Sequence, residues 1–125
     1  MILLRQILMV ALGSAVGGVL RFLASKGIYQ LAPMKFPLPT LLVNVAGCFL
    51  IGVFYTWSSD SRLMTQDSRL LLTTGLCGGF TTFSAFAHEN IVLMRTGAYP
   101  MILVYILLSV VLGILAVFAG MQLFR

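Results

Sequence analysis

Charged residues are scarce in this chain of 125 residues. Only 9% are Asp, Glu, Lys or Arg, and none of the three acidic residues precedes Asp60, whereas 60% of the chain is hydrophobic. A soluble domain of this length has too small an interior to bury so much apolar surface. The shortage of charge therefore excludes an ordinary soluble domain, and lipid must be the solvent for most of the chain.

Metal-binding and catalytic residue types are also rare. The two cysteines, Cys48 and Cys77, form no CxxC motif, and a single histidine accompanies them. This set indicates neither a zinc site nor a redox pair, so we interpret the cysteines as small buried fillers. Ser84, His88 and Glu89 lie close together, but one helix offers no sharp nucleophile turn and no oxyanion donors. The sequence therefore does not predict an enzyme.

Long apolar runs are what the chain has instead. They lie at about residues 4–25, 38–58, 69–94 and 98–124, and the four prolines lie in the links between them or in the first residues of a run. Each run is close to the ~20 residues that an α-helix needs to cross the hydrocarbon core. The N-terminal run also fits a signal peptide, but apolar character resumes as VLRFLASKGIYQL, which favours a first transmembrane helix. We therefore predict an all-α membrane protein with one four-helix transmembrane domain over residues 1–125.

The basic residues do not select an orientation in the membrane. With an even number of crossings, one side holds Arg5, Arg62, Arg69 and Arg125. The other side holds Arg21, Lys26, Lys35 and Arg95. Such a tie gives the positive-inside rule nothing to act on, so either the chain inserts both ways or one decisive charge or a partner fixes a single topology. Insertion both ways permits an antiparallel homodimer. Basic residues scattered through short loops indicate no nucleic acid, and nothing indicates a soluble protein partner.

Polar side chains inside the first two runs are candidates for function, because lipid tolerates them only beside a partner or water. Gly13 and Gly17 form a GxxxG motif that permits close helix packing. Arg21 follows, and it either extends to the interface or brings positive potential to the entrance of an anion pathway. Asn44, in the second run, either forms a hydrogen bond with another helix or contacts an ion.

The third run contains GLCGGFTTFSAF, residues 75–86. We expect Gly75, Gly78 and Gly79 to weaken the helix there, and the hydroxyl residues after them to compete for backbone groups. A membrane permits a broken helix only where the freed backbone faces a cavity or binds an ion. Exposed carbonyls suit a cation such as Na⁺, whereas the N-terminus of the next half-helix favours an anion.

Aromatic and hydroxyl residues complete the pattern. Phe80 and Phe83 are three residues apart, hence nearly on one face of a helix. The positive edges of such rings can stabilise a small anion, although packing is the usual role of a membrane phenylalanine. In the fourth run, Tyr105 and Ser109 start a narrow polar stripe, a weak signal by itself.

The motifs GGVLRF, PLPTLLVNVAGCFLIG and GLCGGFTTFSAF resemble those of the Fluc family of small bacterial fluoride channels, also known as the camphor-resistance or CrcB family. The resemblance covers the whole chain, and the third motif is the most specific. It implies an antiparallel dual-topology homodimer in the bacterial inner membrane, with two fluoride pores and a central structural Na⁺. It also implies that fluoride leaves the cell by passive electrodiffusion, which lowers fluoride toxicity.

The same resemblance assigns individual residues. Phe80 and Phe83 correspond to the phenylalanines whose ring edges contact fluoride. Asn44 corresponds to the polar residue near the pore, and Arg21 to the arginine of an electropositive vestibule. Ala85 departs from the family, many members of which have a hydroxyl residue there.

Backbone and hydroxyl oxygens are assigned in the same way. The carbonyls of Gly75 and Gly78 correspond to the positions that bind Na⁺ at the centre of the dimer. The hydroxyl residues assigned to the ion pathway are Thr81, Thr82, Ser84, Tyr105 and Ser109. Several hydroxyls, an amide and ring edges can replace the water around a small, strongly hydrated anion without a fixed cation that would trap it.

Two other membrane functions fit the sequence less well. Small four-helix multidrug exporters combine this length with dual topology, but they depend on an acidic residue in the first helix, and this chain has none before Asp60. A membrane scaffold would explain the packing glycines but not the GGFTTF sequence.

Overall fold

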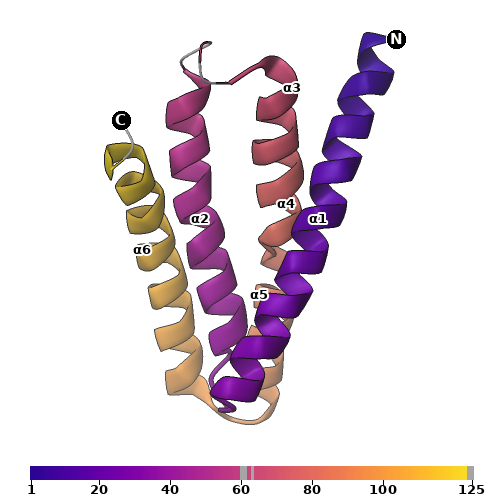
Figure 1. Cartoon of the computed structure of the whole chain (residues 1–125). Helices are drawn as coiled ribbons and strands as arrows, with labels where there is room; N and C mark the ends of the chain where they lie inside the picture. Colours follow the sequence, from indigo (N-terminus) through magenta and orange to yellow (C-terminus); the bar gives the residue numbers. More distant parts are fainter. Residues whose placement is uncertain (60–61, 63, 124–125) are drawn as a thin grey trace.

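The computed structural model describes residues 1–59, 62 and 64–123, which form a bundle of apolar helices (Figure 1). In chain order the elements are α1 (Ile2–Leu31), α2 (Leu38–Ser58), α3 (Gln66–Arg69), the π-helix η1 (Leu70–Cys77), α4 (Gly78–Phe80), α5 (Phe83–Arg95) and α6 (Tyr99–Leu123). The segments from α3 to α5 together make the third crossing. Four segments are thus long and apolar enough to cross a membrane, as the apolar runs predict.

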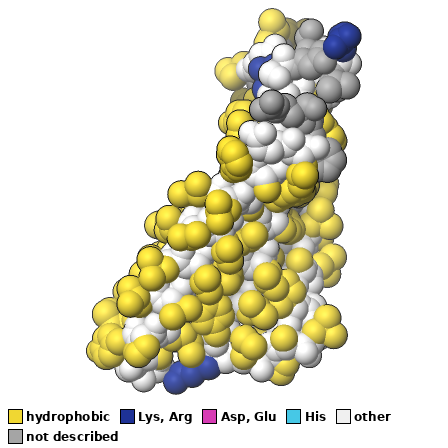
Figure 2. Space-filling model, turned by 90° about the vertical axis from the view of Figure 1, so that its left-hand side faces the viewer, with side chains coloured by type: hydrophobic (Ala, Val, Ile, Leu, Met, Phe, Trp, Pro, Cys, Tyr) yellow, Lys and Arg dark blue, Asp and Glu magenta, His cyan; other side chains and the backbone are white. Residues whose placement is uncertain are grey.

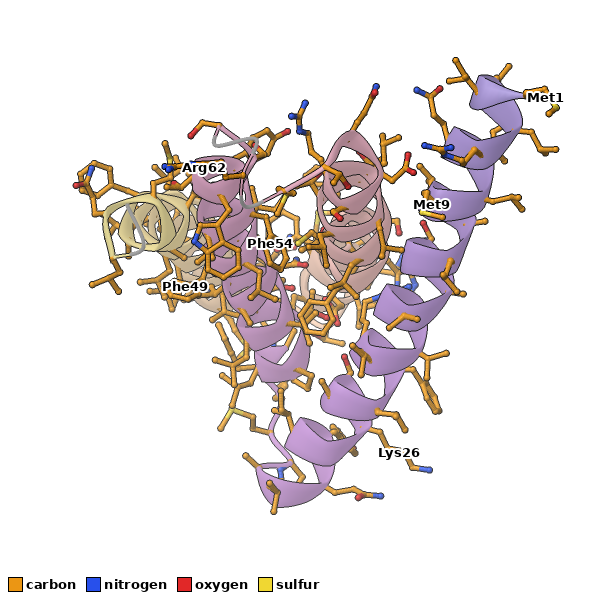
Figure 3. All side chains as sticks on the ribbon, turned by 45° about the horizontal axis from the view of Figure 1, so that its top comes forward. Met1, Met9, Lys26, Phe49, Phe54 and Arg62 are labelled. Carbon is orange, nitrogen blue, oxygen red and sulfur yellow. The ribbon has the colours of Figure 1, made fainter. Side chains whose placement is uncertain are left out.

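The ends of the bundle differ in what they carry. Figure 1 shows the N-terminus, the C-terminal end of α6 and the α2–α3 link at one end, and the α1–α2 and α5–α6 links at the other. Met1 and Arg62 lie at the first end, and Lys26 lies near the opposite end of α1 (Figure 3). Arg125, which the charge comparison places with Arg62, lies outside the described residues.

Arg21 is farther from the helix end than the charge comparison assumes. The first helix continues to Leu31, ten residues beyond Arg21. At 1.5 Å per residue, this places Arg21 about 15 Å along the helix from its last residue. Arg21 therefore lies well within the length of α1 and is half-buried there, so we do not count its charge among the loop residues of that end.

Two pairs of helices pack with their backbones in contact. A Cβ atom on Gly13 or Gly17 of α1 would collide with a carbonyl oxygen of η1. A Cβ atom on Gly52 of α2 would collide with the backbone of α6, and one on Gly120 with that of α2. The GxxxG prediction is therefore confirmed, because only glycine allows these backbones to approach so closely.

The third crossing is broken, as predicted, but later than the glycines. Gly75, Gly78 and Gly79 all lie in helical turns, and the backbone becomes extended only at Thr81 (φ −89°, ψ 160°) and Thr82 (φ −152°, ψ 120°). The Gly75 carbonyl, expected to be freed, accepts a hydrogen bond from the Gly78 N–H. The physical reason is that the glycines provide close helix packing, whereas β-branched threonines favour extended backbone.

Apolar side chains cover the outside of the bundle. Most large hydrophobic residues of α1 and α6 are exposed, and Figure 2 shows hydrophobic side chains over much of the face that it presents. The small interior consists of one cluster around Val53, Phe54 and Cys77 and another around Leu41, Leu93 and Tyr105. This inversion of the usual soluble pattern is what a lipid solvent requires.

Candidate ion pathway

Asn44 of α2 binds the break in the third crossing with both ends of its amide. Its Nδ2 donates to the Thr82 carbonyl at 2.9 Å, and its Oδ1 accepts from the Thr82 N–H at 2.8 Å. These bonds replace the helical partners that an extended residue loses, and a membrane offers no water to do so. Of the two readings of Asn44, the structure therefore shows the interhelical hydrogen bond.

Arg21 of α1 performs a similar task at the carbonyl end of α4. Its Nε donates to the Gly79 carbonyl at 3.1 Å. In an unbroken helix this carbonyl would accept from the N–H of Phe83, which lies beyond the break. A cation at the carbonyl end of a helix also complements the helix dipole. The side chain is half-buried, and this bond directs its Nε toward the break.

The threonine hydroxyls cap the two helix ends that meet at the break. Thr81 Oγ1 donates to the Cys77 carbonyl at 2.9 Å. Thr82 Oγ1 accepts from the Ala85 N–H at 3.2 Å and lies 3.2 Å from Ser84 Oγ. Threonine is a favoured N-cap residue for this reason. The hydroxyls that the sequence assigns to an ion pathway therefore also stabilise the broken helix.

An open groove of about 340 Å³ lies beside the break. Its walls come from α2, the break, α5 and α6, and its lining includes no Asp, Glu, Lys, Arg or His. The lining residues are Asn44, Cys48, Ile51, Thr81, Thr82, Phe83, Phe86, Ser109, Val110 and Val117. The structure thus brings together five of the residues that the sequence predicts for the ion pathway. Cys77 is fully buried, as expected of a filler, whereas Cys48 is half-buried and lines the groove.

The phenyl rings of the groove are those of Phe83 and Phe86. Phe83 is 78% exposed, and its ring centroid lies 5.6 Å from that of Phe86. Phe80 lies instead against Gly47 of α2 and does not line the groove. Phe80 and Phe83 do not share a helix face, because the extended residues between them interrupt the helix. The missed signal is FSAF, a second pair of phenylalanines three residues apart.

A carboxylate with two hydroxyl donors lies between α2, α5 and α6. Thr40 Oγ1 donates to Glu89 Oε2 and Tyr105 Oη to Glu89 Oε1, each at 2.8 Å. Tyr105 is fully buried and Thr40 is 7% exposed. The sequence left Glu89 without a role, and its signal was its place as the only acidic residue inside a predicted span. Ser109 lies one turn from Tyr105 on α6 and lines the groove.

These features define a small multi-pass membrane protein whose broken third helix borders an uncharged, largely apolar groove with a few amide and hydroxyl groups. The chain belongs to the CrcB-like family (camphor resistance), whose model matches residues 8–121. It is 49% identical over 117 residues to the fluoride-specific ion channel FluC of Phocaeicola vulgatus. The aligned residues make up 94% of this chain and 96% of that protein. It is also 44% identical over 111 residues to the protein of the same name from Aquifex aeolicus, covering 89% and 90% of the two chains.

Proposed function

We propose that this protein is a fluoride channel of the bacterial inner membrane and not an enzyme. The observation that carries the proposal is the uncharged groove beside the break, whose largely apolar lining includes Asn44 and three hydroxyl residues, in a chain that is 49% identical to a fluoride-specific ion channel. Fluoride is small and strongly hydrated, so a pathway must offer several donors at once in place of water. Hydroxyl groups and ring edges provide such donors without a fixed cation.

The proposed mechanism is passive electrodiffusion. A groove lining without a charged side chain neither traps the anion nor supplies a proton-transfer group. The negative-inside membrane potential then drives fluoride out of the cell. HF that enters from acidic surroundings dissociates in the cytoplasm, and export of the anion lowers its toxicity.

The proposed path runs from the groove to the carboxylate cluster. The ring edges of Phe83 and Phe86 contact fluoride first, with the hydroxyls of Thr81, Thr82 and Ser84 at the break. Ser109 then passes the ion toward Thr40 and Tyr105, whose hydroxyls donate to Glu89 and have to turn from its carboxylate to donate to the ion. Only the Nε of Arg21 donates to the Gly79 carbonyl, so its other N–H groups can donate to an anion. The positive potential of the guanidinium also favours an anion at the vestibule. Phe80 does not line the groove of one copy, so this path does not include it, and its assignment to the ion pathway stays a prediction.

We further propose that a second, antiparallel copy completes two pores. Phe83 is 78% exposed on an open groove, so a partner surface is needed to enclose the ion. The near balance of basic residues between the two ends favours insertion in both orientations. A structural Na⁺ would lie between the copies at the start of α4, beside the Gly78 carbonyl. Gly78 is exposed there, whereas Gly75 is buried and its carbonyl is already bonded, so Gly78 is the stronger ligand.

Fluoride efflux from liposomes that contain only the purified protein tests the proposal. A fluoride electrode records release when a potassium ionophore sets the potential, without a proton gradient. We expect rapid fluoride release and almost no chloride release. Protein-free liposomes are the control. Equal chloride release, or release that requires a proton gradient, contradicts the proposal.

A further inference from the structure

Four aromatic rings form a continuous row beside the polar path. Ring centroids are 5.6 Å apart for Phe83 and Phe86, 4.9 Å for Phe86 and Tyr105, and 5.5 Å for Tyr105 and Phe36. Phe83 lies on the groove, and Phe36 belongs to the link between α1 and α2. The row therefore connects the groove with one end of the molecule.

Phe36 is held against the bundle although it lies in a link. Its ring packs on the buried cluster of Leu41, Leu93 and Tyr105, and it meets the Tyr105 ring at 78°, edge to face. Its carbonyl accepts from the Leu38 N–H at 2.8 Å. Proline follows it at position 37 and restricts the backbone. The ring is thus a fixed part of the fold with no helix around it.

The carboxylate cluster lies directly behind this ring. Thr40 is three residues from the link, at the start of α2, and Tyr105 is in the second turn of α6. Figure 1 shows that both helices begin at the end of the molecule where the α1–α2 link lies. Because Tyr105 is fully buried and touches Phe36, the Phe36 ring is a cover between the cluster and water at this end.

The surroundings of this cover suit an anion. Lys35 precedes Phe36 and is exposed, and Lys26 and Arg95 belong to the same end of the molecule. Figure 2 shows basic side chains at the lower end of the bundle. Such charges raise the local concentration of an anion that enters or leaves.

We propose that Phe36 closes the link end of the ion pathway and controls the passage of fluoride between water and the cluster of Thr40, Glu89 and Tyr105. This inference rests on the proposed fluoride function. Because the ring lies between the cluster and water, it has to move aside for each ion that passes this end. An outward swing of the link would move it. A smaller side chain speeds this step, and a larger one slows it.

The first test compares fluoride efflux from liposomes for Phe36→Ala, Phe36→Leu and Phe36→Trp. We expect faster efflux for Phe36→Ala, slower efflux for Phe36→Trp and an intermediate rate for Phe36→Leu, which keeps most of the apolar contact. Phe22→Ala is the matched control, because Phe22 lies on α1 with 63% of its surface exposed. Efflux at the parent rate for the folded Ala and Trp variants overturns the proposal.

The second test measures the cover without any fluoride. Leu41→Cys, in a chain that also carries Cys48→Ala and Cys77→Ala, places one thiol behind the ring. A water-soluble thiol reagent should modify it about tenfold faster with Phe36→Ala, as expected if opening costs about 1.4 kcal/mol less. Phe22→Ala should leave the rate unchanged.

The two readouts separate this proposal from the fluoride function. If the parent passes no fluoride while Phe36→Ala still accelerates labelling, the fluoride function fails and Phe36 remains a cover. If the parent passes fluoride but Phe36→Ala changes neither rate, the function stands and the cover is refuted. Faster labelling with unchanged efflux also refutes Phe36 as a residue of the pathway.

Discussion

Asn44 shows how one side chain replaces a lost segment of helix. Its amide offers one donor and one acceptor to the backbone of Thr82, in the arrangement that a neighbouring strand would provide. The sequence predicted a functional role for this residue because a polar group in lipid requires a partner. It did not reveal the partner, because the spacing between Asn44 and Thr82 says nothing about which helices lie side by side.

Replacing Asn44 by Asp should destabilise the protein, because the Thr82 carbonyl loses its donor and faces a carboxylate. A buried polar group left without a partner costs about 1–3 kcal/mol. Thermal unfolding in detergent should therefore begin at a lower temperature than for the parent. Ser109→Ala is the matched control, since Ser109 lines the same groove on another helix. Parent-like unfolding of Asn44→Asp would mean that the break does not depend on the amide.

The phenyl rings provide a second test at the scale of the residue. Phe83→Ile and Phe86→Ile keep apolar bulk but remove a ring edge from the groove, so fluoride efflux should fall. We expect a fall of about fivefold, since an aromatic contact is worth about 1 kcal/mol. Phe80→Ile is the control, because that ring lies outside the groove. If Phe80→Ile reduces efflux as much as Phe83→Ile, ring position is not what matters.

At the scale of the element, the crossings were predictable and the break was only partly so. Apolar length fixes a membrane helix, and all four runs became helices long enough to cross. The break was expected at Gly75–Gly79 because glycine loosens an isolated helix. In the bundle Gly75 and Gly79 meet α1, the whole segment remains helical, and the break falls on Thr81 and Thr82. Local propensity could not show this, because the deciding contacts come from another helix.

The glycine contacts of α1 are testable with neighbouring residues. Gly17→Ala should weaken the packing of α1 on the third crossing, because a Cβ there would collide with the Leu76 carbonyl. Overpacking of this kind costs about 1–3 kcal/mol. Gly18→Ala is the control, since no atom lies within 4 Å of its added Cβ. Folded yield and the unfolding temperature should fall for the first variant only, and equal behaviour of both would contradict the close contact.

At the scale of the whole molecule, the open groove and the near balance of basic residues both bear on how two copies are oriented in the membrane. The termini and the α2–α3 link share one end, as an even number of crossings requires (Figure 1). The count of basic residues on the other end was less accurate, because Arg21 lies inside the bundle. A monomer cannot reveal which orientation its neighbour adopts, so the arrangement of two copies remains a prediction.

Labelling of an N-terminal cysteine in intact cells tests that arrangement. With Ile2→Cys in a chain lacking Cys48 and Cys77, an impermeant reagent should label part of the protein, and the remainder should react only after the membrane is opened. A protein of known single topology is the control. Complete labelling, or none, before the membrane is opened would show one orientation and contradict the antiparallel dimer.

The support of the break by Arg21 and Asn44 has a consequence for biosynthesis. Both residues belong to the first two crossings, which leave the ribosome before the third crossing is complete. The extended residues therefore meet their partners in the membrane as soon as they arrive. A peptide of residues 66–95 in detergent micelles lacks these partners, and NMR should show helix continuing through Thr81 and Thr82. The order of synthesis thus protects the segment that is least able to satisfy its own backbone in lipid.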